Sequence, residues 1–233
     1  MDNRYNSVYD INMALNKEVI FLDFRSGLNS DKPQIINLLV DSFKEYTTTK
    51  NMFQPQYRSS AKFDRLLRKY FELEVNVFMK KGLVYVGADG KGKPRAVALI
   101  EFSSGNQISN WDYLTLDGLK LIPEIIKSGF NGFNAFDIFK FEDLFDLVKG
   151  KKKCAVEYLA VDKKLRGQGI GSKMLNNHIT PYVKKIGYRN IILETNTQKN
   201  VKFYKKNHFS VRSVKRVNLS HGDVKDWVLS RPI

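Results

Sequence analysis

The chain has 233 residues, a formal net charge of +15, and 42% hydrophobic and 12% aromatic residues. This composition excludes an intrinsically disordered chain, and the length suits one large domain or two small ones. No stretch of about 18 uncharged apolar residues and no signal-like N-terminus occur, so we expect no membrane partner.

The first 102 residues predict an alternation of helices and strands. Residues 1–17 form a polar lead-in, and Pro33 stands in the first turn of a helix whose apolar residues recur up to Phe43. A second helix is expected over residues 60–78. Strands are expected over residues 19–25, 83–86 and 96–102, the last two joined by a glycine-rich hairpin turn.

Residues 103–153 predict a helical insertion between the third and fourth strands, with helices over 116–127 and 136–148. The second helix mixes acidic residues with phenylalanines, which would suit the wall of a site for a cationic amine. An ordinary amphipathic helix with a solvated acidic face is the simpler explanation.

Residues 154–233 predict strand, loop, helix, strand, helix and a final hairpin. Strands are expected over 155–161, 190–194, 209–219 and 224–229, and helices over 169–186 and 201–206. Pro181 is expected to end or kink the longer helix early.

The excess of basic residues has two explanations. It could serve nucleic acid or the phosphates of a nucleotide cofactor. However, lysines are spread along the whole chain, and no RNA-binding motif with interleaved aromatic residues occurs. We therefore expect no nucleic-acid partner, although affinity that falls steeply with salt would indicate one.

The loop after the fourth predicted strand carries the clearest functional signal, Arg166-Gly-Gln-Gly169-Ile-Gly171-Ser172. Glycines at the start of a helix let backbone N–H groups converge on an anion such as a pyrophosphate. A Walker loop is absent there, and the glycine spacing differs from that of a dinucleotide-binding loop. The loop matches position for position the coenzyme A pattern [Arg/Gln]-x-x-Gly-x-[Gly/Ala].

The stretch EYLAVDKKLRGQGIGSKML resembles motif A of the GNAT acetyltransferase superfamily, and ILETNTQKNVKFYKKNHF is similar to its motif B. Within the superfamily, puromycin N-acetyltransferase-like members are closest in layout. The resemblance implies a single α/β domain with a mixed, largely antiparallel sheet flanked by helices. It departs from the family at His208, where Gly is usual and would permit a left-handed helix end, so we expect this helix end to be built differently.

The resemblance implies transfer of an acetyl group from acetyl-CoA to an amine by direct attack in a ternary complex. A non-catalytic acyl-CoA-binding or regulatory module is the alternative. The expected acetyl-CoA contacts are Leu159, Ala160, Val161, Arg166, Gly167, Gln168, Gly169, Ile170, Gly171, Ser172, Asn200 and Tyr204. Asn200 could instead cap the helix that begins near it.

Two residues are candidates for the chemistry. Tyr204 stands at the family's general-acid position, and a phenol can protonate a thiolate. Glu157 is the candidate base, because strand alternation would place it on one face with Leu159 and Val161. A core tyrosine and a structural glutamate are the respective alternatives, and deprotonation through water needs no single base.

Other chemistry finds little support in the sequence. Cys154, the single cysteine, cannot form an internal disulfide and has no histidine arranged with it, so it favours a cytoplasmic protein and no nucleophile. No metal-ligand spacing occurs, so we expect no metal. We expect a monomer or a homodimer.

Overall fold

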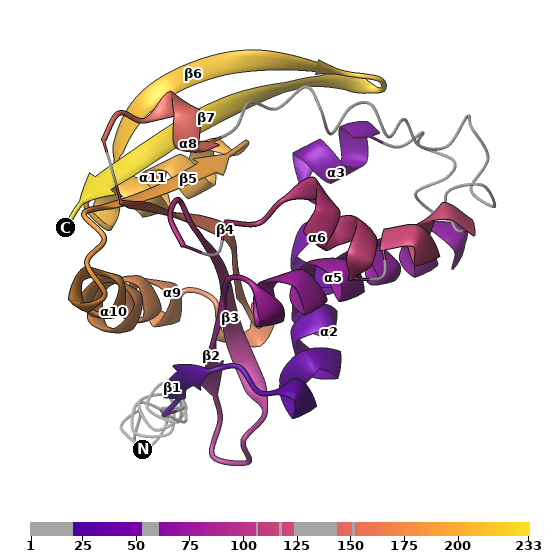
Figure 1. Ribbon diagram of the computed structural model, residues 1–233, viewed down its shortest axis with the longest axis horizontal. Coiled ribbons are helices and arrows are strands. Elements are labelled where there is room, and N and C mark those ends of the chain that lie inside the picture. The colour runs from indigo at the N-terminus through magenta and orange to yellow at the C-terminus, as the bar shows by residue number, and fades with distance from the viewer. Residues whose placement is uncertain (1–20, 53–60, 106, 117, 124–143, 151) are drawn as a thin grey trace, which may run out of the picture.

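The computed structural model describes residues 21–52, 61–105, 107–116, 118–123, 144–150 and 152–233. They form one seven-stranded sheet with helices on both faces (Figure 1). The strand order is β1-β2-β3-β4-β5-β7-β6, and neighbouring strands are antiparallel except for β4 and β5. The strands are β1 (Asp23–Ser26), β2 (Leu83–Ala88), β3 (Pro94–Phe102), β4 (Lys153–Val161), β5 (Asn190–Thr195), β6 (Ser210–Leu219) and β7 (Gly222–Pro232). The predicted fold class is confirmed.

Helices α2 (Lys32–Phe43) and α5 (Ala61–Lys80) cover one face of the sheet, while α9 (Ile170–Lys173), η5 (Met174–Ile179) and α10 (Thr180–Lys185) cover the other (Figure 1). The shorter elements are η1 (Asn29–Asp31), α3 (Thr47–Met52), α6 (Asn110–Thr115), η2 (Gly118–Leu121), α8 (Leu144–Leu147), η4 (Lys163–Leu165) and α11 (Gln198–Lys206). None of the described helices is long and apolar enough to cross a membrane.

Strand β3 shows how the sequence builds a core on each face. Ala96, Ala98 and Ile100 pack toward α9–α10, and Val97 and Leu99 pack toward α2 and α5. All five are fully buried, as expected for a central strand whose side chains alternate between two covered faces.

Helix α5 follows the same logic at helical spacing. Phe63, Leu67, Phe71 and Val75 recur every four residues and are all buried, so they form one apolar stripe against the sheet. Burying a side chain of this size contributes roughly 1.5–3 kcal/mol.

The helical stretch from 170 to 185 passes through Pro181, so the predicted early end of the helix does not occur, while the predicted kink stays a prediction. The turns just before it, Met174–Ile179, are π-helical. The Thr180 hydroxyl donates to the Leu175 carbonyl oxygen at 2.7 Å. A wider turn moves the carbonyl that a proline ring would otherwise strike, so the helix continues.

Strand β4 changes its surroundings halfway along. It pairs with β5 only at residues 153–155, opposite 190–192, and the two parallel strands then diverge. Its pairing with β3 shifts by one residue at Glu157, because Leu99 is opposite Tyr158 while Ile100 is opposite Val156. This β-bulge precedes the widening gap between β4 and β5.

The insertion differs in part from the prediction. A helix occurs earlier than expected, at α6, and is followed by the 3₁₀ turn η2 within the range expected to be one helix, 116–127. Residues 144–147 are helical, within the predicted range 136–148. The rest of that helix, with its phenylalanines at 136, 139 and 141, lies outside the described residues.

Candidate functional site

The glycine loop joins the end of β4 to the start of α9. Gly167 and Gly169 have φ angles of 82° and 77°, in the left-handed region that glycine adopts at least cost. An added Cβ at either position meets no atom within 4 Å, so the backbone conformation, and not crowding, requires glycine there. At Gly171 the reason is space, since a Cβ would lie 3.2 Å from the Phe203 ring of α11.

Both ends of this loop are anchored in the protein. The Asp162 side chain caps η4 by accepting from the Lys164 N–H at 3.0 Å. Leu165 and Ile170, on either side of the glycines, are buried in the core beneath α9. The loop therefore holds its N–H groups at the positive end of a helical stretch running to residue 185.

Arg166 is largely engaged within the protein. Its Nε donates to the Val161 carbonyl oxygen at 2.9 Å, and an η nitrogen donates to the Ser42 hydroxyl at 2.9 Å. These bonds tie the glycine loop to β4 and α2. The backbone, more than this guanidinium, is therefore available to bind an anion.

The end of β4 presents a backbone edge toward the gap beside β5. The Asp162 N–H donates to the Arg95 carbonyl oxygen of β3 at 2.8 Å. In an antiparallel pair such bonds alternate, so Ala160 also turns its N–H and C=O toward β3, while those of Leu159 and Val161 point away from it. Leu159 and Val161 are thus better placed than Ala160 to pair with an extended ligand.

The bulge overturns the expected face of Glu157. Leu159 and Val161 pack with the core on the α9–α10 side. Burial, however, raises the pKa of Tyr70, on α5, and of Tyr113, on α6, and the charge of Glu157 adds to both effects. The extra residue breaks the period-two alternation, so Glu157 lies on the α5 face of the sheet.

Tyr204 occupies the interior side of α11. It is 8% exposed, and its ring meets those of Phe203 and Phe209 edge-on at 5.1 and 5.6 Å between centroids. Burial raises its pKa above that of an ordinary phenol, and the nearby Tyr46 adds to the effect. Tyr204 is therefore a protonated donor at neutral pH.

Asn200 is not the helix cap. The cap of α11 is Thr197, whose hydroxyl accepts from the Asn200 N–H at 3.2 Å. The Asn200 amide donates instead to the Thr195 hydroxyl at 3.1 Å, at the end of β5. Asn200 and Tyr204 are four residues apart and share a face of α11.

The end of α11 keeps the family geometry despite His208. This residue has a φ angle of 68°, and the His208 and Phe209 N–H groups donate to the carbonyl oxygens of Lys205 and Tyr204. These two bonds are those of a Schellman motif with His208 in the left-handed position. The expectation of a differently built helix end was wrong.

The sequence analysis missed a buried carboxyl group on the α5 face. Glu74 is 5% exposed and accepts from the Tyr113 hydroxyl at 3.3 Å. Burial raises its pKa to about 7. Tyr70 also bonds to it and shares a 2.7 Å hydroxyl contact with Tyr158. The sequence did contain a signal for Glu74, because this charged residue interrupts the apolar stripe of α5.

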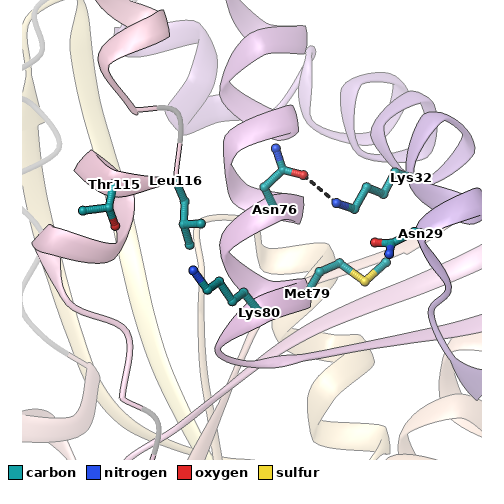
Figure 2. Close-up of a pocket in the computed structure, with 7 residues that line it drawn as sticks. All are labelled: Asn29, Lys32, Asn76, Met79, Lys80, Thr115 and Leu116. Carbon is teal, nitrogen blue, oxygen red and sulfur yellow. Dashed lines mark hydrogen bonds between the residues drawn. The ribbon is translucent and has the colours of Figure 1, made fainter.

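A surface hollow of about 470 Å³ lies elsewhere, between the start of α2, the end of α5 and the residues after α6 (Figure 2). The Lys32 ammonium donates to the Asn76 amide oxygen across it at 2.9 Å, and Lys80 reaches in from the same helix as Asn76. None of its lining residues comes from the glycine loop, β4 or α11, so it is separate from the candidate site.

Cys154 and metal chemistry add nothing to the site. Burial raises the pKa of the Cys154 thiol to about 12, so it stays protonated and unreactive at neutral pH. Within the described ranges, no three His, Cys, Asp or Glu side chains are grouped as metal ligands.

One segment of the chain matches a known protein family in sequence, and the whole fold is similar to solved structures. Residues 128–211 match the family model "Acetyltransferase (GNAT) domain". A histone acetyltransferase HPA2 and related acetyltransferase from Corynebacterium glutamicum is 20% identical, with 91% of this chain and 97% of that one covered and a TM-score of 0.60. No curated protein matches the sequence.

Two further solved structures share the fold. The arylalkylamine N-acetyltransferase 2 from Aedes aegypti is 15% identical, covers 91% of this chain and 99% of its own, and has a TM-score of 0.56. A GNAT superfamily phosphinothricin acetyltransferase from Sinorhizobium meliloti, solved with AcCoA, is 12% identical, with 91% and 89% covered and a TM-score of 0.52. The likeness to puromycin-type members stays a prediction. The resemblance to the GNAT superfamily is confirmed: the chain has the GNAT fold, and its motif segment matches the GNAT acetyltransferase family model.

Proposed function

We propose that the chain is an N-acetyltransferase that moves an acetyl group from acetyl-CoA to an amine within a ternary complex. The observation that carries this proposal is the gap between β4 and β5, which opens directly beside a loop of left-handed glycines. Such a gap accepts an extended ligand, and the loop accepts its phosphates.

Acetyl-CoA fits the residues present. Backbone N–H groups from Gly167 to Ser172 would bind the pyrophosphate at the positive helix end. The N–H and C=O of Leu159 and the N–H of Val161, which point away from β3, would pair with the amides of the pantetheine arm, as a strand edge pairs with a peptide. The Val161 carbonyl oxygen already accepts from Arg166. Gln168 and Ile170 would contribute through the backbone, and Ile170 also anchors the loop in the core.

The chemistry needs an acid for the thiolate and a base for the amine. Tyr204 would give its proton to the departing sulfur. Glu157 would remove the proton from the attacking amine, directly or through water. Its position on the α5 face places it across the sheet from the glycine loop's helix, so the amine would approach from the α5 side.

A non-catalytic acyl-CoA-binding module is the second candidate. It would use the same loop and β4 edge but would not need Tyr204 as an acid. Titration with acetyl-CoA, with NADH as control, comes first. One-to-one binding of acetyl-CoA alone supports both candidates, whereas binding of NADH alone overturns both.

The Tyr204→Phe variant separates the two candidates. We expect turnover on an amine panel to fall at least about 100-fold while acetyl-CoA affinity changes little, because only the acid is lost. The exposed Tyr182, on α10, supplies the matched control Tyr182→Phe. Equal turnover of the two variants would remove Tyr204 from the mechanism. A cytoplasmic location and a monomeric or dimeric state stay predictions.

A further inference from the structure

A segment far from the motifs reaches the end of β5. We call residues 44–52, the connection after α2 together with α3, the strap. The Thr48 hydroxyl donates to the Asn196 amide oxygen at 2.5 Å, and the His221 N–H donates to the Asn51 carbonyl oxygen at 3.0 Å. The strap therefore fastens the α2 side of the molecule to the far strands, about 150 residues later in the chain.

The centre of this fastening is the Tyr46 hydroxyl. It lies 2.8 Å from the Thr195 hydroxyl and accepts from the Asn196 N–H at 2.9 Å. The Thr195 hydroxyl in turn accepts from the Asn200 amide at 3.1 Å. Two buried or half-buried hydroxyls thus receive one N–H bond each from α11 and the chain after β5.

The two hydroxyl protons determine which of Tyr46 and Thr195 donates in the bond between them. One hydroxyl proton is used in the bond between Tyr46 and Thr195, and the other is left to donate. Thr195 is only 2% exposed, whereas Tyr46 is partly accessible. We therefore assign the inner bond to the Thr195 proton and the outward O–H to Tyr46. Besides burial, which raises the pKa of Tyr46, hydrogen bonds from the Asn196 N–H, Thr195 and the Asn200 amide lower it, as donors to its oxygen do. The proton of Tyr46 itself is therefore left to point away from these groups.

The surroundings place Tyr46 between the diverging strands. Its ring lies edge-on to Phe43 at 5.5 Å, and Phe43 lies edge-on to Tyr158 of β4 at 5.3 Å. On its other side it meets Thr195 of β5 and the face of α11 that carries Asn200 and Tyr204. Tyr46 therefore lies close enough to Tyr204 to affect its pKa, and it approaches Tyr204 from the α2 side of the molecule.

We propose that Tyr46 is a second hydrogen-bond donor to the departing sulfur of the thioester, beside Tyr204. This inference rests on the proposed acetyl transfer. The amine nitrogen bonds to the acetyl carbon, the C–S bond breaks, and its electron pair stays on sulfur. Tyr204 delivers the proton that sulfur receives, the amine's proton leaves to the base, and Tyr46 donates a hydrogen bond without transferring a proton.

The kinetic test compares Tyr46→Phe with Thr48→Val, which removes a different hydrogen bond of the same strap. We expect Tyr46→Phe to lower kcat about 10-fold or more, with the KM for acetyl-CoA changed less than about threefold. Thr48→Val should stay within about threefold of wild type. Equal losses in both variants would mean that the strap only holds structure, and would overturn the inference.

A binding test does not depend on turnover. At pH 9, where part of the thiol of CoA is ionised, the wild type should prefer CoA over CoA lacking its sulfur. In Tyr46→Phe, the ratio of the two dissociation constants should fall at least about threefold toward 1. An unchanged preference overturns the role of Tyr46 and leaves the proposed function standing, whereas failure to bind either compound overturns both. The exposed Tyr182, on α10, supplies the matched control, and Tyr182→Phe should keep the wild-type preference.

Discussion

The two faces of the sheet solve different chemical problems with different parts of the chain. On the α9–α11 face, the candidate site consists mainly of backbone: left-handed glycines, a helix start and the outward edge of β4. On the α5 face it consists of side chains, where Glu157 interacts with Tyr70 and Tyr113, and these two tyrosines in turn interact with Glu74. Backbone groups can hold a common cofactor, while side chains can select an acceptor and move its proton.

The largest effect is expected from Glu157→Gln, which tests the chemistry of the α5 face. Removing the base should lower kcat/KM for the amine by about 100-fold or more, because the amine then has to lose its proton unaided. Acetyl-CoA affinity, measured by calorimetry, should be unchanged. A variant with full activity would show that water alone deprotonates the amine.

Glu74→Gln tests whether ionisation of the buried Glu74 carboxyl group destabilises the folded protein. Burial raises the folded-state pKa of Glu74 to about 7, above its ordinary value of 4.5. Its stabilising contribution is therefore complete below about pH 4.5 and is lost as the pH rises through 7. Between pH 5 and 8 the wild type should lose on the order of 3 kcal/mol more unfolding free energy than Glu74→Gln. Urea unfolding at each pH measures the difference.

The control for that experiment lies two residues away. Glu72 is on the same helix but is exposed and paired with Lys69 at 2.8 Å. Glu72→Gln should leave the pH dependence as in wild type. If Glu72→Gln and Glu74→Gln behave alike, burial of Glu74 is not the cause.

Gly169→Ala tests the backbone-based face. Alanine in the left-handed region costs roughly 1–2 kcal/mol, and the loop can avoid this cost by relaxing out of its binding shape. We therefore expect acetyl-CoA affinity to fall about 5- to 30-fold. Gly90→Ala, in the β2–β3 turn where a Cβ meets nothing, is the control, and an equal effect in both would contradict the explanation.

The smallest effect is expected from His208→Gly, at the end of α11. Glycine relieves the left-handed strain but adds freedom to the unfolded chain, so the gain in stability should be about 0.5–1 kcal/mol. Thermal unfolding measures it. Unchanged or lower stability would show that the histidine side chain compensates for its own strain.

The parts of the site that form a local sequence motif could be predicted from the sequence. The glycine loop and Tyr204 are readable because a backbone site needs glycines at fixed spacing within a few residues. Glu74 and Tyr46 were missed because their partners, such as Tyr113 and Thr195, stand far away in the chain. The face of Glu157 was predicted wrongly because one extra residue in β4 reverses the alternation, and no local residue type announces it.

The short contact between β4 and β5 has a consequence for cooperativity. In the described chain, the half-sheet β1–β4 meets the half-sheet β5–β7 through only three register pairs, 153–155 with 190–192. Local opening follows such weak seams, so amide hydrogens of Leu159 and Val161 should exchange faster than those of Ala155. A ligand that pairs with β4 and touches α11 would join the two halves and slow this exchange. Ligand binding would then directly stabilise the association of the two half-sheets.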